Sequence, residues 1–529
     1  MSDSTHTIFH TAKRFFSGTA LSRVAGMMRD MAMAFAFGTQ GSVAAFMLAF
    51  RFAHLLRRLF GEGAMQSAFV PEFEELRHRS PEKAFSFFRD LYAVLTLSLL
   101  ALVVVGGGIL GAVLAYWDLS DDNRQILYLT MIMLPSLVFI CLYGLNASLL
   151  QCEKSYFVAS VAPVAFNAIW IVGVLFLFDW PINRAMVGLS IGVIVACIGQ
   201  WLITVPSAWK AYSQGLPAGS LFSIRLLTPE LATLGRNLFL GILGVAASQV
   251  NNAIDSVFAR YAEIEGPAFL WYAIRIQQLP MALFGVALSS ALLPPLARAI
   301  KKQEWANYDR FMHYALSRTF LMMLPITVAV LFMGDAIINL IYGRGDFDQA
   351  SVSHTTRCLW GYGIGLLPTS VVLLLAPAFY AQGNYSFPAW GSFLCMVSNC
   401  VLNTLFIVGF GWGSVSVAVA TSISAFLNMC FLGWGLWIKQ GSFISKELLA
   451  GIGKVTGVSL IAGAAFYGWR TYWLHDLTID QLLLGHVPYL PRSFADQCLS
   501  FVQQASVLGI LFATSLFAVF PFAKKRQKT

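Results

Sequence analysis

Charge is scarce in this sequence. Only 12% of its 529 residues are Asp, Glu, Lys or Arg, whereas 57% are hydrophobic. Soluble globular proteins carry about 25% charged residues. Apolar runs of about 20 residues recur along the chain, and each is long enough to cross a bilayer as a helix. The composition excludes a soluble globular protein and predicts an all-α, polytopic membrane protein.

Patterns typical of enzymes, metal proteins and secreted proteins are also lacking. The eight cysteines lie mostly within or beside apolar runs, with neither metal-ligand spacing nor a disulfide framework. No Ser/His/Asp arrangement, metal motif or phosphate-binding loop occurs, so we expect no enzyme activity. The N-terminus has no apolar core followed by a small-residue cleavage site, which indicates that no signal peptide is cleaved. A net charge of +9 is explained by basic cytoplasmic loops, so we expect no nucleic-acid partner.

The apolar runs and the charged, glycine or proline breaks between them predict fourteen transmembrane helices. They lie near 17–37, 42–70, 90–116, 127–150, 156–178, 185–208, 230–261, 267–296, 315–334, 352–381, 387–408, 413–438, 448–469 and 498–521. We divide them into an N-terminal lobe of six helices (1–212), a C-terminal lobe of six (213–440) and a last region, 441–529. That region holds helices thirteen and fourteen and a basic tail.

The distribution of Lys and Arg predicts the orientation. With the N-terminus inside, the inner segments hold 22 of these residues and the outer segments hold 5. This ratio fits the positive-inside rule and places both termini in the cytoplasm. The eight basic residues that remain are all arginines within or at the ends of proposed spans: Arg23, Arg29, Arg51, Arg57, Arg58, Arg260, Arg275 and Arg357.

Arginine within a membrane span requires an explanation, because at the bilayer centre it costs about 2.5–3.5 kcal/mol on insertion scales. A planar guanidinium offers two parallel donors that match phosphate oxygens. We interpret Arg23, Arg29, Arg57 and Arg275 as groups that converge on a cavity between the lobes and bind a pyrophosphate-like anion. The alternative is snorkelling or structural pairing, for instance of Arg29 with Asp30.

An internal repeat supports two equivalent lobes. The segment "RFAHLLRRLFGEGAMQSAFVPEF" (51–73) is echoed by "RIQQLPMALFGVALSSALLPPLARAIK" (275–301), and 153–167 is more loosely echoed by 382–399. The two offsets, 224 and 229 residues, nearly agree. Transporters built from parallel repeats place the substrate between their halves and work by rocking one half against the other.

Oxygen-bearing side chains on three predicted helices suggest a cation site. Asp255 lies near the middle of the seventh helix, Asn399 and Asn403 lie one turn apart on the eleventh, and Thr421 lies on the twelfth. Such hard ligands would suit Na⁺. The alternative is that Asp255 pairs with a nearby arginine, Arg260 or Arg275, while the asparagines make interhelical hydrogen bonds.

Four segments carry a resemblance to a known family. "SRVAGMMRD", "LLRRLFGEGAMQSAFVP", "GVALSSALLP" and "APAFYAQGNYSFP" are similar to signature segments of the MurJ (MviN) family. This family comprises lipid II flippases of the multidrug/oligosaccharidyl-lipid/polysaccharide exporter superfamily. The similarity runs in order from about residue 17 to residue 438. Helices thirteen and fourteen match only by position and hydrophobicity.

The resemblance implies a protein of the bacterial cytoplasmic membrane that serves peptidoglycan synthesis and cell shape. It would flip lipid II, the undecaprenyl-diphosphate-linked precursor, from the inner to the outer leaflet by alternating access. The lobes would enclose a cationic cavity for the headgroup, and the last helix pair would form a groove for the polyprenyl tail. We expect a monomer, with cell-wall synthesis proteins as further partners.

The resemblance also implies substrate-binding residues, which fall on Arg23, Arg29, Arg57, Arg275 and Glu62. The sequence departs from the family where many members carry acids, because Ala44, Ile274 and Gln278 stand at those positions. We therefore expect a more positive cavity, with Glu62 as its main counter-charge.

Three other functions compete with lipid II flipping. A multidrug-extrusion exporter coupled to cations would line its site with acids and aromatic residues, whereas arginines dominate here. A flippase for another polyprenyl-linked oligosaccharide would share the same chemistry. A membrane glycosyltransferase would need a carboxylate-rich outer loop, to which "WDLSDDNR" (117–124) comes nearest.

Overall fold

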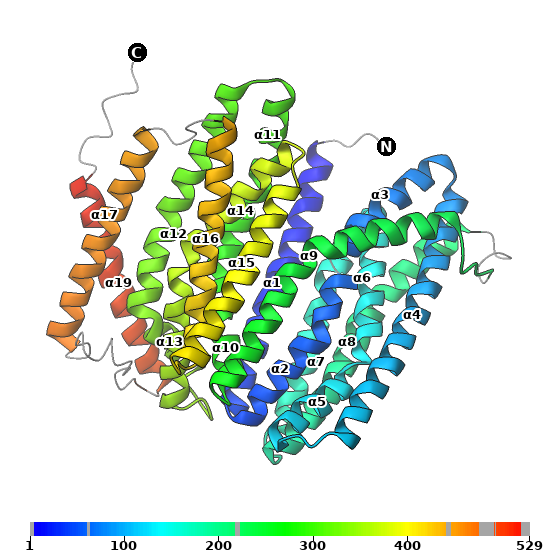
Figure 1. Ribbon diagram of the computed structural model, residues 1–529, viewed down its shortest axis with the longest axis horizontal. Coiled ribbons are helices and arrows are strands. Elements are labelled where there is room, and N and C mark those ends of the chain that lie inside the picture. The colour runs from blue at the N-terminus through cyan, green and yellow to red at the C-terminus, as the bar shows by residue number, and fades with distance from the viewer. Residues whose placement is uncertain are drawn as a thin grey trace. The chain divides into compact units, whose positions relative to one another are not determined.

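A computed structural model describes residues 5–60, 64–216, 223–440, 446–474, 491 and 493–519. Over these residues the regular secondary structure is entirely helical (Figure 1). The chain divides into two compact units, residues 1–253 and 254–529. The all-α class is confirmed, while the predicted lobe boundaries at 212 and 440 stay predictions.

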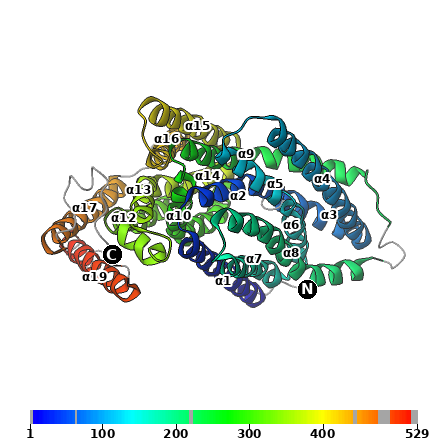
Figure 2. The same cartoon turned by 90° about the horizontal axis from the view of Figure 1, so that it is seen from below.

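The first unit is a bundle of long helices. They are α1 (Thr5–Phe37), α2 (Gly41–Phe60), α3 (Ala64–Arg79), α4 (Pro81–Tyr116), α5 (Asp121–Met133), α6 (Ser136–Cys152), α7 (Tyr156–Leu177), α8 (Ile182–Gly215) and most of α9 (Pro229–Ala262). The helix α7 packs against both α1 and α8 (Figure 2). The polar residue Asn167 of α7 therefore lies against α1.

The second unit follows the same plan and adds two helices. Its elements are α10 (Gly266–Pro280), the π-helical η2 (Met281–Val286), α11 (Ala287–Lys301), α12 (Trp305–Tyr342), α13 (Gln349–Ile364), α14 (Leu366–Ala381), α15 (Ser386–Thr404), the π-helical η3 (Leu405–Gly409), α16 (Val415–Gln440), α17 (Lys446–Trp469), the π-helical η4 (Arg470–Leu474) and α19 (Phe494–Val519). One apolar core of this unit is formed by side chains of α11, α12, α14, α16 and α17. The helices α17 and α19 pack on α12.

The predicted repeat is visible in the order of the elements, because α1–α8 correspond to α9–α16. Both α5/α6 and α13/α14 are bent pairs, with angles of 45° and 41°. The turns that precede α7 and α15 each contain a residue in the left-handed region, Lys154 with φ 57° and Gly383 with φ 72°. The same breaks and turns therefore recur in both halves of the chain.

The described residues include eight helices that are long and apolar enough to cross a membrane, or ten if each bent pair is one span. The number fourteen is thus not confirmed. The predicted helix 42–70 comprises two elements, α2 and α3, with residues 61–63 outside the described part. The predicted helix 267–296 comprises α10, η2 and α11, because Pro280 lacks the N–H that would continue a regular helix.

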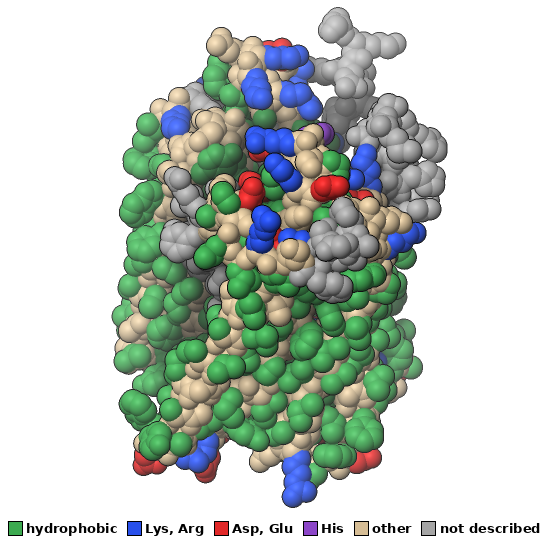
Figure 3. Space-filling view, turned by 90° about the vertical axis from the view of Figure 1, so that its right-hand side faces the viewer, with side chains coloured by type: hydrophobic (Ala, Val, Ile, Leu, Met, Phe, Trp, Pro, Cys, Tyr) green, Lys and Arg blue, Asp and Glu red, His purple; other side chains and the backbone are tan. Residues whose placement is uncertain are grey.

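The surface agrees with a membrane environment. Figure 3 shows one face on which hydrophobic side chains form a broad band, while charged side chains gather toward its two ends. The α4 residue Val104 is 72% exposed and the α7 residue Phe176 is equally so. Large apolar side chains at such exposure fit a lipid-facing surface.

Candidate substrate and cation sites

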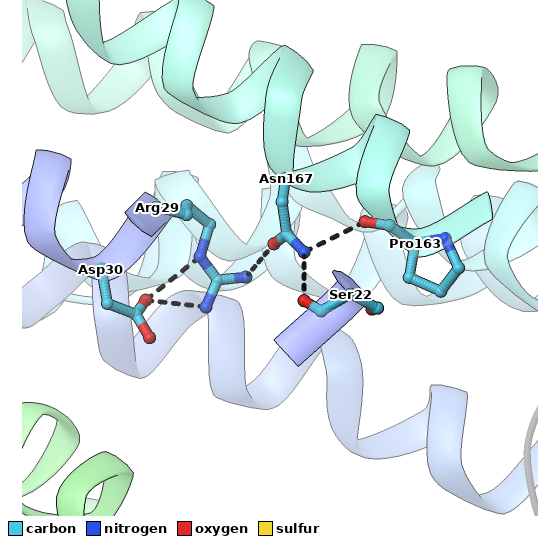
Figure 4. Close-up of polar contacts among 5 residues, drawn as sticks. All are labelled: Ser22, Arg29, Asp30, Pro163 and Asn167. Carbon is cyan, nitrogen blue, oxygen red and sulfur yellow. Dashed lines mark hydrogen bonds and ion pairs between the residues drawn. The ribbon is translucent and has the colours of Figure 1, made fainter. Parts of the chain in front are cut away.

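Arg29 is buried inside the first unit, with only 7% of its surface exposed. It lies on α1, and its Nε and Nη2 donate to Asp30 Oδ1 at 3.1 and 2.7 Å (Figure 4). Its Nη1 donates to Asn167 Oδ1 on α7 at 3.2 Å, and its guanidinium lies 4.8 Å from the ring centroid of Trp170. One carboxylate, one amide oxygen and one aromatic face therefore surround this cation.

Asn167 is itself held in place from its other end. Its Nδ2 donates to the carbonyl oxygen of Pro163 at 3.0 Å and to that of Ser22 at 3.4 Å (Figure 4). Because both amide protons point to carbonyls, the amide oxygen faces Arg29. The contacts tie α7 to α1 and fix the guanidinium.

The other predicted substrate residues lie in different surroundings. Arg23 on α1 is exposed and makes no hydrogen bond or ion pair with a described residue. Arg275 on α10 is partly buried and lies over the ring of Trp271, 4.4 Å from its centroid. The side chain of Arg57 and the whole of Glu62 fall outside the described residues. Convergence of the four arginines on one cavity stays a prediction.

The predicted cation ligands come together in the second unit. Asp255 on α9 is 3% exposed. Its Oδ1 accepts from Asn399 Nδ2 at 2.5 Å and from Asn403 Nδ2 at 3.1 Å, both on α15. Its Oδ2 accepts from Thr421 Oγ1 on α16 at 3.2 Å. The sequence alone thus selected four side chains that share one buried cluster.

The chemistry of this cluster fits a small monovalent cation. It offers the carboxylate of Asp255, the hydroxyl of Thr421 and the amides of Asn399 and Asn403. The amide oxygen of Asn403 is buried and accepts no hydrogen bond from a described residue. Turning an amide about its last torsion would present its oxygen to an ion. Among the described residues there is no group of three or more His, Cys, Asp or Glu that would hold a metal ion. A single carboxylate among neutral oxygens favours one positive charge.

A polar cluster that the sequence did not predict lies at the ends of three helices of the second unit. Ser414 Oγ donates to Glu263 Oε2 at 2.7 Å, and His354 Nδ1 lies 3.7 Å from the same oxygen. The His354 ring stacks on Phe269 with 4.8 Å between centroids. Burial raises the pKa of Glu263, but the contacts with His354 and Ser414 outweigh it and hold the pKa below its ordinary value. The cluster joins the α9–α10 link to α13 and to the residue before α16.

A second feature missed from the sequence is a buried ion pair beneath the last two helices. Arg470 and Asp335 are each 1% exposed. Arg470 Nη1 donates to Asp335 Oδ1 at 2.9 Å and to the carbonyl oxygen of Phe332 at 2.6 Å, while Nη2 bonds Asp335 Oδ2. The predicted helix 448–469 ends one residue before Arg470, but the helical structure continues through η4, and the Arg470 side chain is buried. The pair fixes α17 against α12.

These features define a polytopic α-helical membrane protein built from two repeated halves. Its fold matches a solved inward-facing multidrug resistance MATE family transporter of the MOP superfamily, with a TM-score of 0.62 at 14% identity over 82% of this chain and 95% of that chain. A solved lipid II flippase MurJ in an inward closed conformation matches with a TM-score of 0.75 at 22% identity, over 96% of this chain and 98% of that chain.

The sequence comparisons identify the family. The family model described as "Lipid II flippase MurJ" matches residues 33–487. A "Probable lipid II flippase MurJ" of Chlamydia pneumoniae is 32% identical over 507 residues, which cover 94% of this chain and 90% of the relative. The chain belongs to the lipid II flippase MurJ family. The predicted resemblance is confirmed, and so is the prediction of a transporter rather than an enzyme.

Proposed function

We propose that this protein moves lipid II from the inner to the outer leaflet of a bacterial cytoplasmic membrane, with both of its termini in the cytoplasm. Membership of the family over residues 33–487 supports the substrate. The 22 basic residues of the predicted inner segments, against 5 in the outer ones, support the orientation.

The observation that carries the proposal is the buried guanidinium of Arg29. Asp30 balances its charge, and its donors are already aligned on an oxygen at 2.7–3.1 Å. A diphosphate offers more negative charge and more oxygens than a carboxylate, and it accepts the same parallel hydrogen bonds. We infer that the diphosphate of lipid II displaces Asp30 from Arg29 as it binds. Asp30, which the sequence suggested only as an alternative partner, is then the counter-charge of the empty site.

Transport follows from alternating access. The diphosphate contacts the arginine more closely in a conformation that encloses it. Binding therefore stabilises the conformation in which the inner side is closed. An inside-negative potential of 100 mV contributes about 2.3 kcal/mol per charge to outward movement of an anion. Rocking of two repeated halves then exposes the headgroup on the outer side.

Depletion with complementation tests the proposal. Cells depleted of the protein should accumulate lipid II on the inner leaflet, and the wild-type gene should restore its appearance outside. Arg29→Ala should insert in the membrane at wild-type levels and fail to restore flipping. Arg79→Ala is the matched control, because the Arg79 side chain is 72% exposed and pairs only with its own helix neighbour Glu75 among described residues. A normal leaflet distribution in depleted cells would contradict the proposal.

We also propose that Asp255, Asn399, Asn403 and Thr421 bind Na⁺ in the second unit. Support comes from their shared cluster and from the buried Oδ1 of Asn403. The purified protein should then unfold at a higher temperature in NaCl than in choline chloride at the same ionic strength. Asp255→Asn should abolish this difference in unfolding temperature. The control Asp346→Asn, at an exposed residue, should leave the difference unchanged. An equal response in the Asp255→Asn variant would refute the site.

The protein's assembly state is a further part of the proposal. We propose that one chain is the working unit, because the repeat supplies both halves of the rocking transporter. The partners would be the cell-wall synthesis proteins that consume lipid II at the outer leaflet. Flipping by single chains in proteoliposomes at a high lipid-to-protein ratio, with rate proportional to protein, would be the expected result.

A further inference from the structure

Two of the buried aspartates, Asp30 and Asp255, occupy equivalent positions in the repeat. Asp30 lies seven residues before Phe37, the last residue of α1, and Asp255 lies seven residues before Ala262, the last residue of α9. In each half a three-residue link then leads to a glycine that begins the next helix, Gly41 or Gly266. The Arg29 site and the cation cluster are therefore copies of one location.

The facing helices correspond in the same way. Trp170 on α7 corresponds to an asparagine on α15. The repeat offset of 229 residues pairs it with Asn399, and a count of twelve residues back from the next helix, Ile182 or Val415, pairs it with Asn403. Asn167 lies one turn before Trp170, and Asn399 lies one turn before Asn403. Two side chains on one stripe of the neighbouring helix thus contact Arg29 in the first copy and Asp255 in the second.

The two copies differ in what they present to the carboxylate. Arg29 precedes Asp30, whereas the isoleucine Ile254 precedes Asp255. Where the first copy has the ring of Trp170 over the guanidinium, the second has the amides of Asn399 and Asn403 on the carboxylate. Thr421, six residues into α16, corresponds to Gly188, six residues into α8. Oxygen ligands therefore appear in the copy that has no arginine at this position.

We propose that Arg29 is a built-in cation of the first unit, and that Ile254 is the residue that leaves the equivalent site of the second unit to an exchangeable monovalent cation. This inference rests on the cation site proposed above, and it identifies position 254 as the residue that decides whether that site needs an ion. The exchangeable cation should carry one positive charge, because the guanidinium that balances Asp30 at the equivalent position carries one. Only the second unit would then respond to the ion concentration.

An arginine at position 254 has the geometry to take over this role. In α1 the guanidinium folds onto the carboxylate of the next residue. The same arrangement recurs in α4, where Arg89 Nε and Nη2 each lie 2.8 Å from Oδ1 of the neighbouring Asp90 and both residues are buried. Two independent helices thus show that arginine directly before a buried aspartate reaches it. In Ile254→Arg the guanidinium should therefore reach Asp255.

The test compares the thermal midpoint of the purified full chain in NaCl and in choline chloride of equal ionic strength. Wild type should show a shift to higher temperature in NaCl. In Ile254→Arg and in Ile254→Lys this shift should fall at least tenfold, and the midpoint in choline chloride should reach that of wild type in NaCl. Ile254→Gln is the control, because its side chain is long and polar but uncharged, and it should keep the shift.

The outcomes distinguish a failure of the cation site from a failure of the role of Ile254. A wild-type protein without a sodium shift removes the cation site itself. A wild-type shift that persists in folded Ile254→Arg and Ile254→Lys leaves the site standing and overturns the role of Ile254. The same conclusion follows if both charged variants fail to fold while Ile254→Gln folds, because a cation that fits the site should stabilise it.

Discussion

The buried pair between Arg470 and Asp335 makes a quantitative prediction about the last two helices. Both side chains are 1% exposed, and the guanidinium is bidentate on the carboxylate. Removing one partner leaves the other charge buried without compensation, which costs about 3–5 kcal/mol. Asp335→Asn should therefore lower the free energy of unfolding by this amount. Replacing both partners, as Asp335→Leu with Arg470→Met, should change it by only about 1 kcal/mol, because the desolvation cost is removed with the charges.

The assay is unfolding of the purified protein in detergent micelles, followed by helix content. Glu75→Gln is the control, since Glu75 pairs with Arg79 at the surface, where the side chains are 60% and 72% exposed. That pair should contribute no more than about 1 kcal/mol. The reasoning would be refuted if Asp335→Asn were as mild as Glu75→Gln, or if the double variant were as unstable as the single one.

Three further predictions concern polar contacts of single side chains. Asn167→Ala removes the acceptor of Arg29 Nη1 and should cost about 1–3 kcal/mol of unfolding free energy, measured in the same assay; no loss would contradict the contact. Trp170→Leu removes the aromatic face over the guanidinium, so it should cost about 0.5–2 kcal/mol more in the wild-type background than in an Arg29→Gln background; an equal cost in both would contradict the contact. Because the pKa of Glu263 is lowered from 4.5, its stabilising contribution is present above that pH and is lost as the pH falls through the folded value. Glu263→Gln should therefore flatten the fall of the thermal midpoint below about pH 5, and an unchanged pH profile would contradict the contacts with His354 and Ser414.

Local patterns in the sequence were sufficient for the class of fold and for the grouping of Asp255, Asn399, Asn403 and Thr421. Apolar runs gave the all-α membrane class, since only their length and composition matter. The contacts among these four side chains were predictable because a carboxylate and amides within apolar helices are stabilised by hydrogen bonds with one another. The helix breaks were not predictable in this way, since the apolar runs continue through Pro135 and Gly365, where the chain bends.

The contacts that could not be predicted from the sequence join residues that lie far apart in it. Asn167 lies 138 residues from Arg29, and Asp335 lies 135 residues from Arg470. No spacing rule links such pairs, so the sequence predicts a helix that ends before Arg470 and indicates no role for Asn167. Asp30 was available as a neighbour of Arg29, but only the packing of α7 against α1 shows that the guanidinium is enclosed.

The most direct measurement of the central claim is the affinity of purified protein for lipid II in wild type and in Arg29→Gln. A hydrogen bond to a charged group contributes about 1.5–3 kcal/mol, so the variant should bind about 10- to 100-fold more weakly. Arg79→Gln should bind as wild type does. Unchanged affinity in a folded Arg29→Gln variant would contradict the claim that this buried guanidinium holds the diphosphate.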